Sequence, residues 1–170
     1  MPEDKPIRVF LDSSILRVFT LGNEAVNFLV MFPMLGCPVE IVLSSYTLSE
    51  TLEVLSRPKI PPKARIAVVQ GIAVGTIQGK WRVRLEDPDA ARVRAMGQYC
   101  RDPKDWPVLA DALAEECDYL VTSDRDLLDI GDEAPITCID PGALLALLMS
   151  HPTIQSQLMQ IAATLTSVQS

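Results

Sequence analysis

The chain has 170 residues, of which 48% are hydrophobic and 22% are charged, and its formal net charge is -7. This length and composition fit one domain with a sizeable buried core and exclude a disordered chain. The acidic balance also excludes a protein that coats nucleic acid through a broad basic surface, although a nuclease with a pocket of carboxylates stays possible.

Short apolar runs alternate along the chain with segments of helical pattern. In chain order we predict a strand at 7–11, a helix at 23–35, a strand at 39–43, helices at 47–56 and 63–77, a strand at 81–85, helices at 89–100 and 105–117, strands at 118–122 and 136–139, and a helix at 142–149. The first run, Ile-Arg-Val-Phe-Leu, is typical of a strand that is covered on both faces. This alternation indicates an α/β fold with a parallel sheet.

The cysteines do not form a metal-binding or disulfide pattern. The four of them contain no Cys-x-x-Cys pair, and His151 is the single histidine, so we expect reduced thiols and no zinc site. No stretch approaches the ~20 apolar residues that span a bilayer, and the start of the chain lacks the pattern of a signal peptide. We therefore expect a soluble, cytoplasmic protein with no membrane partner.

Four carboxylates that are distant in sequence are expected to meet at one edge of this sheet. The carboxyl ends of parallel strands share an edge, where ligand sites form. Asp12 closes the first strand, and Asp124 follows the strand that comes after the helix starting at Asp105. That helix begins at the same edge, and Glu50 lies about one and a half turns into another helix that also begins there. The topology thus brings all four together.

Such a cluster of like charges needs a cation or protonation to be stable. The ligands offered are all oxygen atoms, which favours a hard cation, Mg²⁺ or Mn²⁺. These ions retain water, can convert it into a nucleophile and stabilise charge on a phosphodiester. The residues therefore indicate hydrolytic phosphoryl transfer.

Four segments resemble a known family. They read Leu-Asp-Ser-Ser-Ile-Leu at 11–16, Ser-Glu at 49–50 with Glu-Val-Leu-Ser-Arg-Pro-Lys at 53–59, Asp-Pro-Lys-Asp at 102–105, and Asp-Tyr-Leu-Val-Thr-Ser-Asp-Arg-Asp-Leu-Leu at 118–128. In this order they resemble the PIN domain, and more closely the toxin components of toxin-antitoxin systems related to the VapC-like ribonucleases. The resemblance covers roughly residues 7–148.

This resemblance implies a three-layer α/β fold, with a central, mainly parallel twisted sheet flanked by helices, and a metal-dependent endoribonuclease. Asp12, Glu50, Asp105 and Asp124 would be both the catalytic residues and the ligands of Mg²⁺ or Mn²⁺. The family usually has Asp-x-Asn at the first motif, and this chain has Ser14 at the position of the asparagine. An antitoxin protein and a homodimer are the partners expected besides the RNA substrate.

Neighbouring residues are rivals or auxiliaries of this quartet. Thr122 matches a Thr-x-Asp element and is expected to orient Asp124, while Asp102 competes with Asp105, and Asp126 competes with or assists Asp124. Each carboxylate also has an ordinary structural explanation, such as a turn residue or a helix cap. Asp111, six residues beyond Asp105, is expected to face away, about 240° around the helix.

Two groups of basic residues precede the later acidic motifs. Those proposed to hold RNA phosphates are Arg57, Lys59, Lys63, Arg65, Arg101 and Lys104. Each of them is equally compatible with a solvated surface.

The end of the chain has a different character from the rest. From position 141 to 170 there is no Lys, Arg, Asp or Glu, yet Ile154, Leu158, Ile161, Leu165 and Val168 recur at helical spacing. Such an apolar seam needs a surface to cover it, either its own domain, a second copy or an antitoxin. We therefore divide the chain into a nuclease domain at 1–150 and a helical tail at 151–170 that is not a separate domain.

Two functions of different classes stay open. The first is the metal-dependent ribonuclease, and the second is a catalytically weak or inactive PIN-like module that binds RNA or a protein partner. The Ser14 departure and the apolar tail are the features that favour the second. A phosphatase of the aspartyl-phosphate type would need a second acid two residues after Asp12, where this chain has Ser14.

Overall fold

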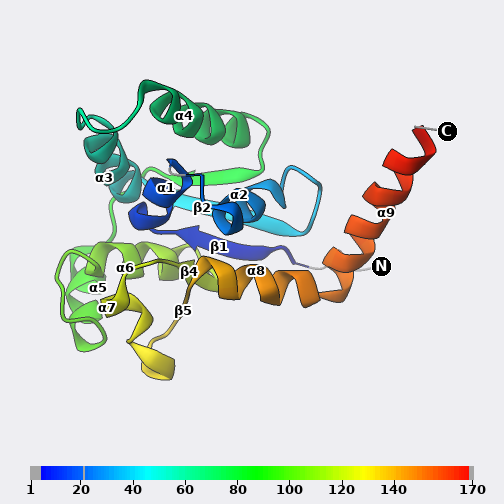
Figure 1. The fold of residues 1–170 in the computed structure, drawn as a ribbon. Coiled ribbons are helices and arrows are strands. Elements are labelled where there is room, and N and C mark those ends of the chain that lie inside the picture. Colours follow the sequence, from blue (N-terminus) through cyan, green and yellow to red (C-terminus); the bar gives the residue numbers. More distant parts are fainter. Residues whose placement is uncertain (1–4, 21, 169–170) are drawn as a thin grey trace.

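Five parallel strands form the sheet at the centre of the chain, in the order β3-β2-β1-β4-β5 (Figure 1). A computed structural model describes residues 5–20 and 22–168, apart from the side chains of Thr20 and Val168. The strands are β1 (Ile7–Leu11), β2 (Val39–Ser44), β3 (Trp81–Arg84), β4 (Tyr119–Val121) and β5 (Thr137–Ile139). All four pairings are parallel, so the predicted α/β fold with a parallel sheet is confirmed.

Helices cover both faces of the sheet and form the two outer layers. They are α1 (Ser13–Thr20), α2 (Glu24–Met31), α3 (Ser45–Leu55), α4 (Pro62–Ile77), α5 (Ala90–Ala95), α6 (Trp106–Ala114), α7 (Arg125–Leu128), α8 (Pro141–Ser150) and α9 (Pro152–Val168). Two short 3₁₀ helices, η1 (Met96–Gln98) and η2 (Gly131–Glu133), complete the set in the described chain. Helices α1, α2, α4 and α8 contribute to the core on one face, and α5, α6 and α7 to the core on the other.

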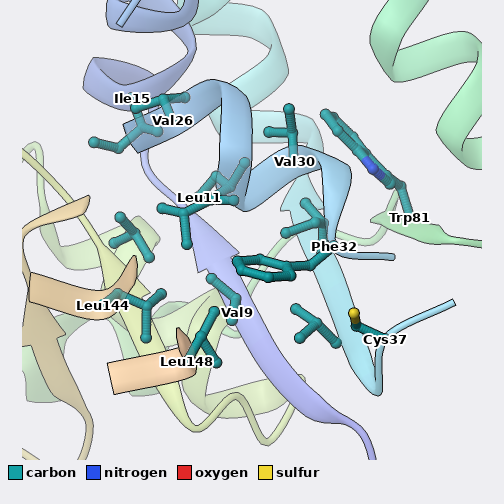
Figure 2. Close-up of a cluster of buried hydrophobic side chains, with 14 of the residues drawn as sticks. Val9, Leu11, Ile15, Val26, Val30, Phe32, Cys37, Trp81, Leu144 and Leu148 are labelled. Atoms are coloured by element: carbon teal, nitrogen blue, oxygen red, sulfur yellow. The ribbon is translucent and has the colours of Figure 1, made fainter. Parts of the chain in front are cut away.

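The strands separate these two cores because successive side chains point to opposite faces. In β1, Val9 and Leu11 lie in the first core together with Phe32 and Leu144, as Figure 2 shows. Phe10, between them, lies in the second core. Val9, Phe10 and Leu11 are fully buried, as predicted for a strand covered on both faces. The central strand thereby fixes where Asp12 leaves the sheet.

Helix α3 lies between the two cores, at the carboxyl edge of the sheet. Tyr46 packs against the core that contains α6, and Leu48 packs against the core that contains α1. The helix starts with a capping box in which the Ser44 hydroxyl accepts a hydrogen bond from the Thr47 backbone N–H at 3.3 Å. This start, directly after β2, fixes the position of Glu50 one and a half turns later.

The last helix, α9, is only partly packed. Ile154 is fully buried in the core beside α8, Leu158 and Ile161 are partly buried, and Leu165 is 63% exposed. In Figure 1 the helix leaves the body of the domain after its first turns. Val168, the last member of the predicted seam, and residues 169–170 have side chains outside the described set. The division at position 150 therefore stays a prediction.

Membrane insertion receives no support from the helices. Within residues 5–20 and 22–168, none combines the length and the apolar character that a bilayer crossing requires.

Candidate active site

The ends of β1 and β4 lie side by side and bring two of the predicted carboxylates to one edge. The backbone N–H of Asp12 donates to the carbonyl of Val121 at 3.0 Å, one residue beyond the last pair of the β1–β4 register. Asp124 follows three residues after Val121. The chain therefore juxtaposes residues that are more than a hundred positions apart.

The carboxylate of Asp12 is held by hydroxyl groups. Its Oδ2 accepts hydrogen bonds from Ser14 Oγ at 2.6 Å and from Thr122 Oγ1 at 2.9 Å, while Ser13 Oγ lies 3.5 Å from Oδ1. The side chain is only 5% exposed. These hydroxyl groups fix the orientation of the Asp12 carboxylate at the end of β1.

The same hydroxyls reach the segment that carries Asp124. Ser14 Oγ accepts from the backbone N–H of Ser123 at 3.1 Å, and Thr122 Oγ1 accepts from that of Asp124 at 3.0 Å. Asp124 in turn accepts from the Asp126 N–H at 2.8 Å and caps α7. Ser14, at the position of the usual asparagine, thus contacts both the first and the last acidic segment.

Asp105 faces this pair from the start of α6. It occupies the N-cap position but makes no side-chain cap, and its Oδ2 accepts instead from the Cys100 thiol at 3.6 Å. Burial, followed in order of size by the charges of Asp124, Asp102 and Asp12, raises the pKa of Asp105 to about 6. Asp124 and Asp12, two of the other predicted ligands, are therefore near enough for their charges to act on Asp105.

Glu50 joins the site through Tyr46, one turn earlier in α3. The Tyr46 hydroxyl donates to the Lys104 carbonyl at 3.1 Å, which ties α3 to the turn before Asp105. Burial, together with the nearby carboxylates of Glu50 and Asp105, raises the pKa of Tyr46 to about 12. Glu50 and Asp105 are therefore both near the Tyr46 hydroxyl.

The two rivals have other roles. Asp102 Oδ1 accepts from the Lys104 backbone N–H at 3.0 Å and so supports the turn that precedes α6. Asp126 is exposed, and its backbone N–H rather than its carboxylate contacts Asp124. The charge of Asp124 acts most strongly on Asp105, and that of Asp102 follows it.

The predicted RNA-binding residues divide into one structural and several exposed side chains. Arg65 donates to the carbonyls of Ile60 and Arg57 and so closes the α3–α4 connection. Arg57 is exposed and lies 4.0 Å from Glu53. Lys59, Lys63, Arg101 and Lys104 are exposed and form no ion pair with any other described residue. These four side chains are available to phosphates.

The donor set fits a hard cation by its chemistry. It consists of carboxylates, and the mutual repulsion at Asp105 is what a bound cation would relieve. Among the described residues, however, no three His, Cys, Asp or Glu side chains come close enough to enclose a metal ion. Coordination would therefore require these side chains to move toward a shared ion.

Two contacts of the acidic residues were not predicted from the sequence, that of Tyr46 with Glu50 and that of Cys100 with Asp105. For Asp111 the sequence predicted only that it faces away from the site. Tyr46 could have been found, since it precedes Glu50 by four residues and shares its helix face. No sequence signal pointed to Cys100 beside Asp105. Asp111 lies away from the acidic edge, fully buried, with its Oδ1 3.3 Å from Arg84 Nε.

The fold and the acidic edge define a class, and the comparisons agree with it. The family model of the PIN domain matches residues 8–126, so this chain belongs to the PIN domain family. PIN domains are typically nucleases and generally bind divalent metals. No curated protein matches the sequence.

Two solved structures are similar to the chain. One is the crystal structure of PAE2754 from Pyrobaculum aerophilum, with 19% identity and a TM-score of 0.58, over 85% of this chain and 97% of that one. The other is a PilT N-terminus domain protein, SSO1118, from the hyperthermophilic archaeon Sulfolobus solfataricus P2, with 13% identity and a TM-score of 0.44, over 85% and 95%. At its low identity the first of these supports the PIN-like fold and nothing more specific.

Asp105→Asn is expected to raise the melting temperature of the metal-free protein near neutral pH by roughly 2–4 °C. The folded-state pKa of about 6 exceeds the ordinary 3.8, so folding favours the protonated acid. The stability from this group is fully present below pH of about 4 and is lost as pH rises through about 6. Asparagine carries no charge at either pH.

Thermal unfolding in EDTA at about pH 4 and about pH 7.5 measures this effect. The gain should shrink toward zero at the lower pH. Glu133→Gln removes an exposed carboxylate from η2 and serves as the matched control. A gain of equal size at both pH values would show that repulsion at Asp105 is not its cause.

Proposed function

We propose that this PIN domain is a metal-dependent endoribonuclease that hydrolyses RNA phosphodiester bonds in the cytoplasm. The observation that carries the proposal is the concentration of Asp12, Asp105 and Asp124 at one sheet edge, near enough for their charges to interact. Glu50 lies near Tyr46, whose hydroxyl is also within reach of the Asp105 charge. These four carboxylates would hold Mg²⁺ or Mn²⁺.

When bound, the ion would supply an activated water and stabilise negative charge on the phosphodiester in transition. The residues of the chain then have separate tasks. The hydroxyls of Ser14 and Thr122 orient Asp12, and through the Ser123 and Asp124 N–H groups they fix the second acidic segment. Tyr46 keeps α3 against the turn before Asp105.

The exposed basic side chains would bind the phosphates of the RNA substrate. Lys104 and Arg101 stand in the segment just before Asp105, and Lys59 and Lys63 stand beyond the end of α3. Phosphates of a single strand can bind such groups without any base contact. We expect cleavage to weaken as salt rises, because these contacts release counterions.

The direct test uses purified full-length protein, free of any partner, and a panel of transfer and messenger RNAs. Cleavage is expected with Mg²⁺ or Mn²⁺ and is expected to stop in EDTA. Absence of cleavage with either ion would refute the ribonuclease and favour the second candidate, a PIN-like module that binds RNA or a protein. This candidate stays open because no three His, Cys, Asp or Glu side chains among the described residues lie close enough together to hold a metal ion.

The toxin role is a further part of the proposal. It is supported by the sequence resemblance, and α9 offers an uncharged helix whose outer half is exposed to a partner, either an antitoxin or a second copy. A neighbouring reading frame for a small protein with a DNA-binding start and a disordered tail, and co-purification of its product, would support the role. Growth that is unaffected by expression of the chain alone would contradict it.

A further inference from the structure

A polar pocket adjoins the acidic edge, and Arg101 is the one residue of its lining that the proposal above uses. It is open, about 380 Å³ in volume, and lined by Tyr99, Arg101, Asp126, Asp129 and Ile130. This volume lies within the range of about 300–1,000 Å³ that is typical of small-molecule sites. The pocket therefore has room for one flat ring system.

Its walls come from the two segments that also carry the acidic edge. Asp126 is two residues from Asp124, and its N–H donates to the Asp124 carboxylate at 2.8 Å. Arg101 precedes Asp102, which lies close enough to Asp105 for its charge to act there. A nucleotide with its phosphate at the acidic edge can thus place its base in the pocket without crossing another element.

The charged groups of the pocket are free to bind a ligand. Arg101, Asp126 and Asp129 are exposed, and none of the three forms an ion pair or a side-chain hydrogen bond with the described part of the chain. Asp126 and Asp129 are three residues apart, so they share one side of the α7 turn. Tyr99 is partly buried against the core of α6, which fixes its ring in the wall.

We propose that this pocket binds a guanine base of the RNA substrate. Guanine presents two adjacent donors, N1–H and N2–H, which match one carboxylate, and two adjacent acceptors, O6 and N7, which match the guanidinium of Arg101. The Tyr99 ring offers a surface for stacking. The inference rests on the proposed ribonuclease function for its substrate, but its binding chemistry does not require the metal.

Other bases fit this set of groups less well. Adenine and cytosine each present one amino group beside an acceptor, and uracil presents one N–H between two carbonyl oxygens. When one N–H of any of these bases donates to a carboxylate, the group beside it is an acceptor, which the second carboxylate oxygen repels. In guanine the group beside it is a second donor. A carboxylate that has no partner in the chain, supplied by Asp126 or Asp129, is therefore the feature that selects guanine.

Binding of free nucleotides to the full-length protein in EDTA tests the pocket without any cleavage. GMP is expected to bind at least about tenfold more tightly than AMP, CMP or UMP, and IMP, which lacks the 2-amino group, is expected to lose about tenfold. NMR titration measures both affinities and reports whether the Tyr99 ring protons shift. Asp129→Asn should reduce the preference for GMP over IMP, whereas the matched control Glu133→Gln should keep it.

The outcomes separate this inference from the proposed function. Equal binding of all nucleotides, no binding of GMP, or a GMP preference that survives both Asp129→Asn and Asp126→Asn would overturn the guanine pocket, even if the protein cleaves RNA. A melting temperature near that of the parent shows that each variant is folded. Selective GMP binding with no cleavage under Mg²⁺ or Mn²⁺ would uphold the pocket and refute the ribonuclease.

Discussion

Asp12→Asn lowers the rate of metal-dependent RNA cleavage by about a hundredfold or more, if the proposed ribonuclease is correct. The amide is nearly the same size as the carboxylate, and its oxygen can still accept from Ser14 and Thr122, so the hydrogen bonds at 2.6 and 2.9 Å can persist. What disappears is the negative charge that would face the cation. The loss should therefore appear in cleavage and in Mn²⁺ affinity, with little change in folding.

Single-turnover cleavage and Mn²⁺ titration measure this effect, and thermal unfolding in EDTA checks the fold. Asp132→Asn, which removes an exposed carboxylate from η2, is the control and should cleave like the parent. An Asp12→Asn protein that cleaves as fast as the parent would exclude Asp12 from the reaction. Loss of cleavage together with loss of folding would assign Asp12 a structural role instead.

Arg84→Met is expected to destabilise the protein by about 3–5 kcal/mol, the largest stability effect that the structure indicates. Arg84 lies 3.3 Å from Asp111 and 3.0 Å from Glu115, which are 0% and 6% exposed. Neither carboxylate oxygen of Asp111 has a hydrogen bond of standard geometry among the described residues, and Arg84 supplies the positive charge beside it. Burial raises the pKa of Asp111, while Ser44 and Arg84 act in the opposite direction.

Urea unfolding of two further variants isolates the cause. Arg82→Met removes an arginine that pairs with the same Glu115 but is 52% exposed, and it should cost no more than about 1 kcal/mol. Adding Asp111→Asn to Arg84→Met should restore part of the lost stability, because it removes the uncompensated charge. Equal losses for the two arginine variants would show that burial of the Asp111 charge is not the reason.

The strands were predictable because their signal is local. Each is a short apolar run, and all five predicted strands are present with ends within about two residues, the usual uncertainty of assignment. The parallel order followed from the helices between them. The position of Asp12 and Asp124 at one edge is a consequence of this topology, so it could be predicted without any side-chain detail.

Helix α1 was not predicted because packing rather than composition stabilises it. Its sequence, Ser-Ser-Ile-Leu-Arg-Val-Phe-Thr, is rich in β-branched and aromatic residues of modest helix propensity. Ile15 and Leu16 are almost fully buried. An isolated helix of this length is not stable in water, so tertiary contacts decide its conformation. Helix α7 was not predicted because its four residues are too few to show a helical period of apolar residues in the sequence.

Three predicted helices are shorter in the structure, for local reasons. The prediction at 23–35 ends at Met31, shortly before Pro33, and the one at 105–117 ends at Ala114, before Glu116 adopts a positive φ of 52°. The helix at 89–100 changes to 3₁₀ geometry at Met96. Turn conformation, which is weakly encoded in pattern, sets each of these ends.

The contacts within the site were less predictable than its location. The bond from Ser14 to Asp12 depends on the first turn of α1, and that from Cys100 to Asp105 depends on the segment between η1 and α6. Neither segment has a periodic pattern from which its path could be read. The pocket beside Asp126 arises in the same way, since it exists only where the turn before α6 approaches α7.

The hydrogen bond from Thr122 to Asp12 also has a consequence for the order of folding. It joins residues 110 positions apart, and it can form only after β4 has paired with β1. Contacts of such sequence separation form slowly, because a long loop must close first. During synthesis β1, β2 and β3 can associate while β4 is still absent. The acidic edge is therefore among the last parts of the domain to assemble. A nascent or truncated chain that stops before Asp124 lacks one of the carboxylates of this edge.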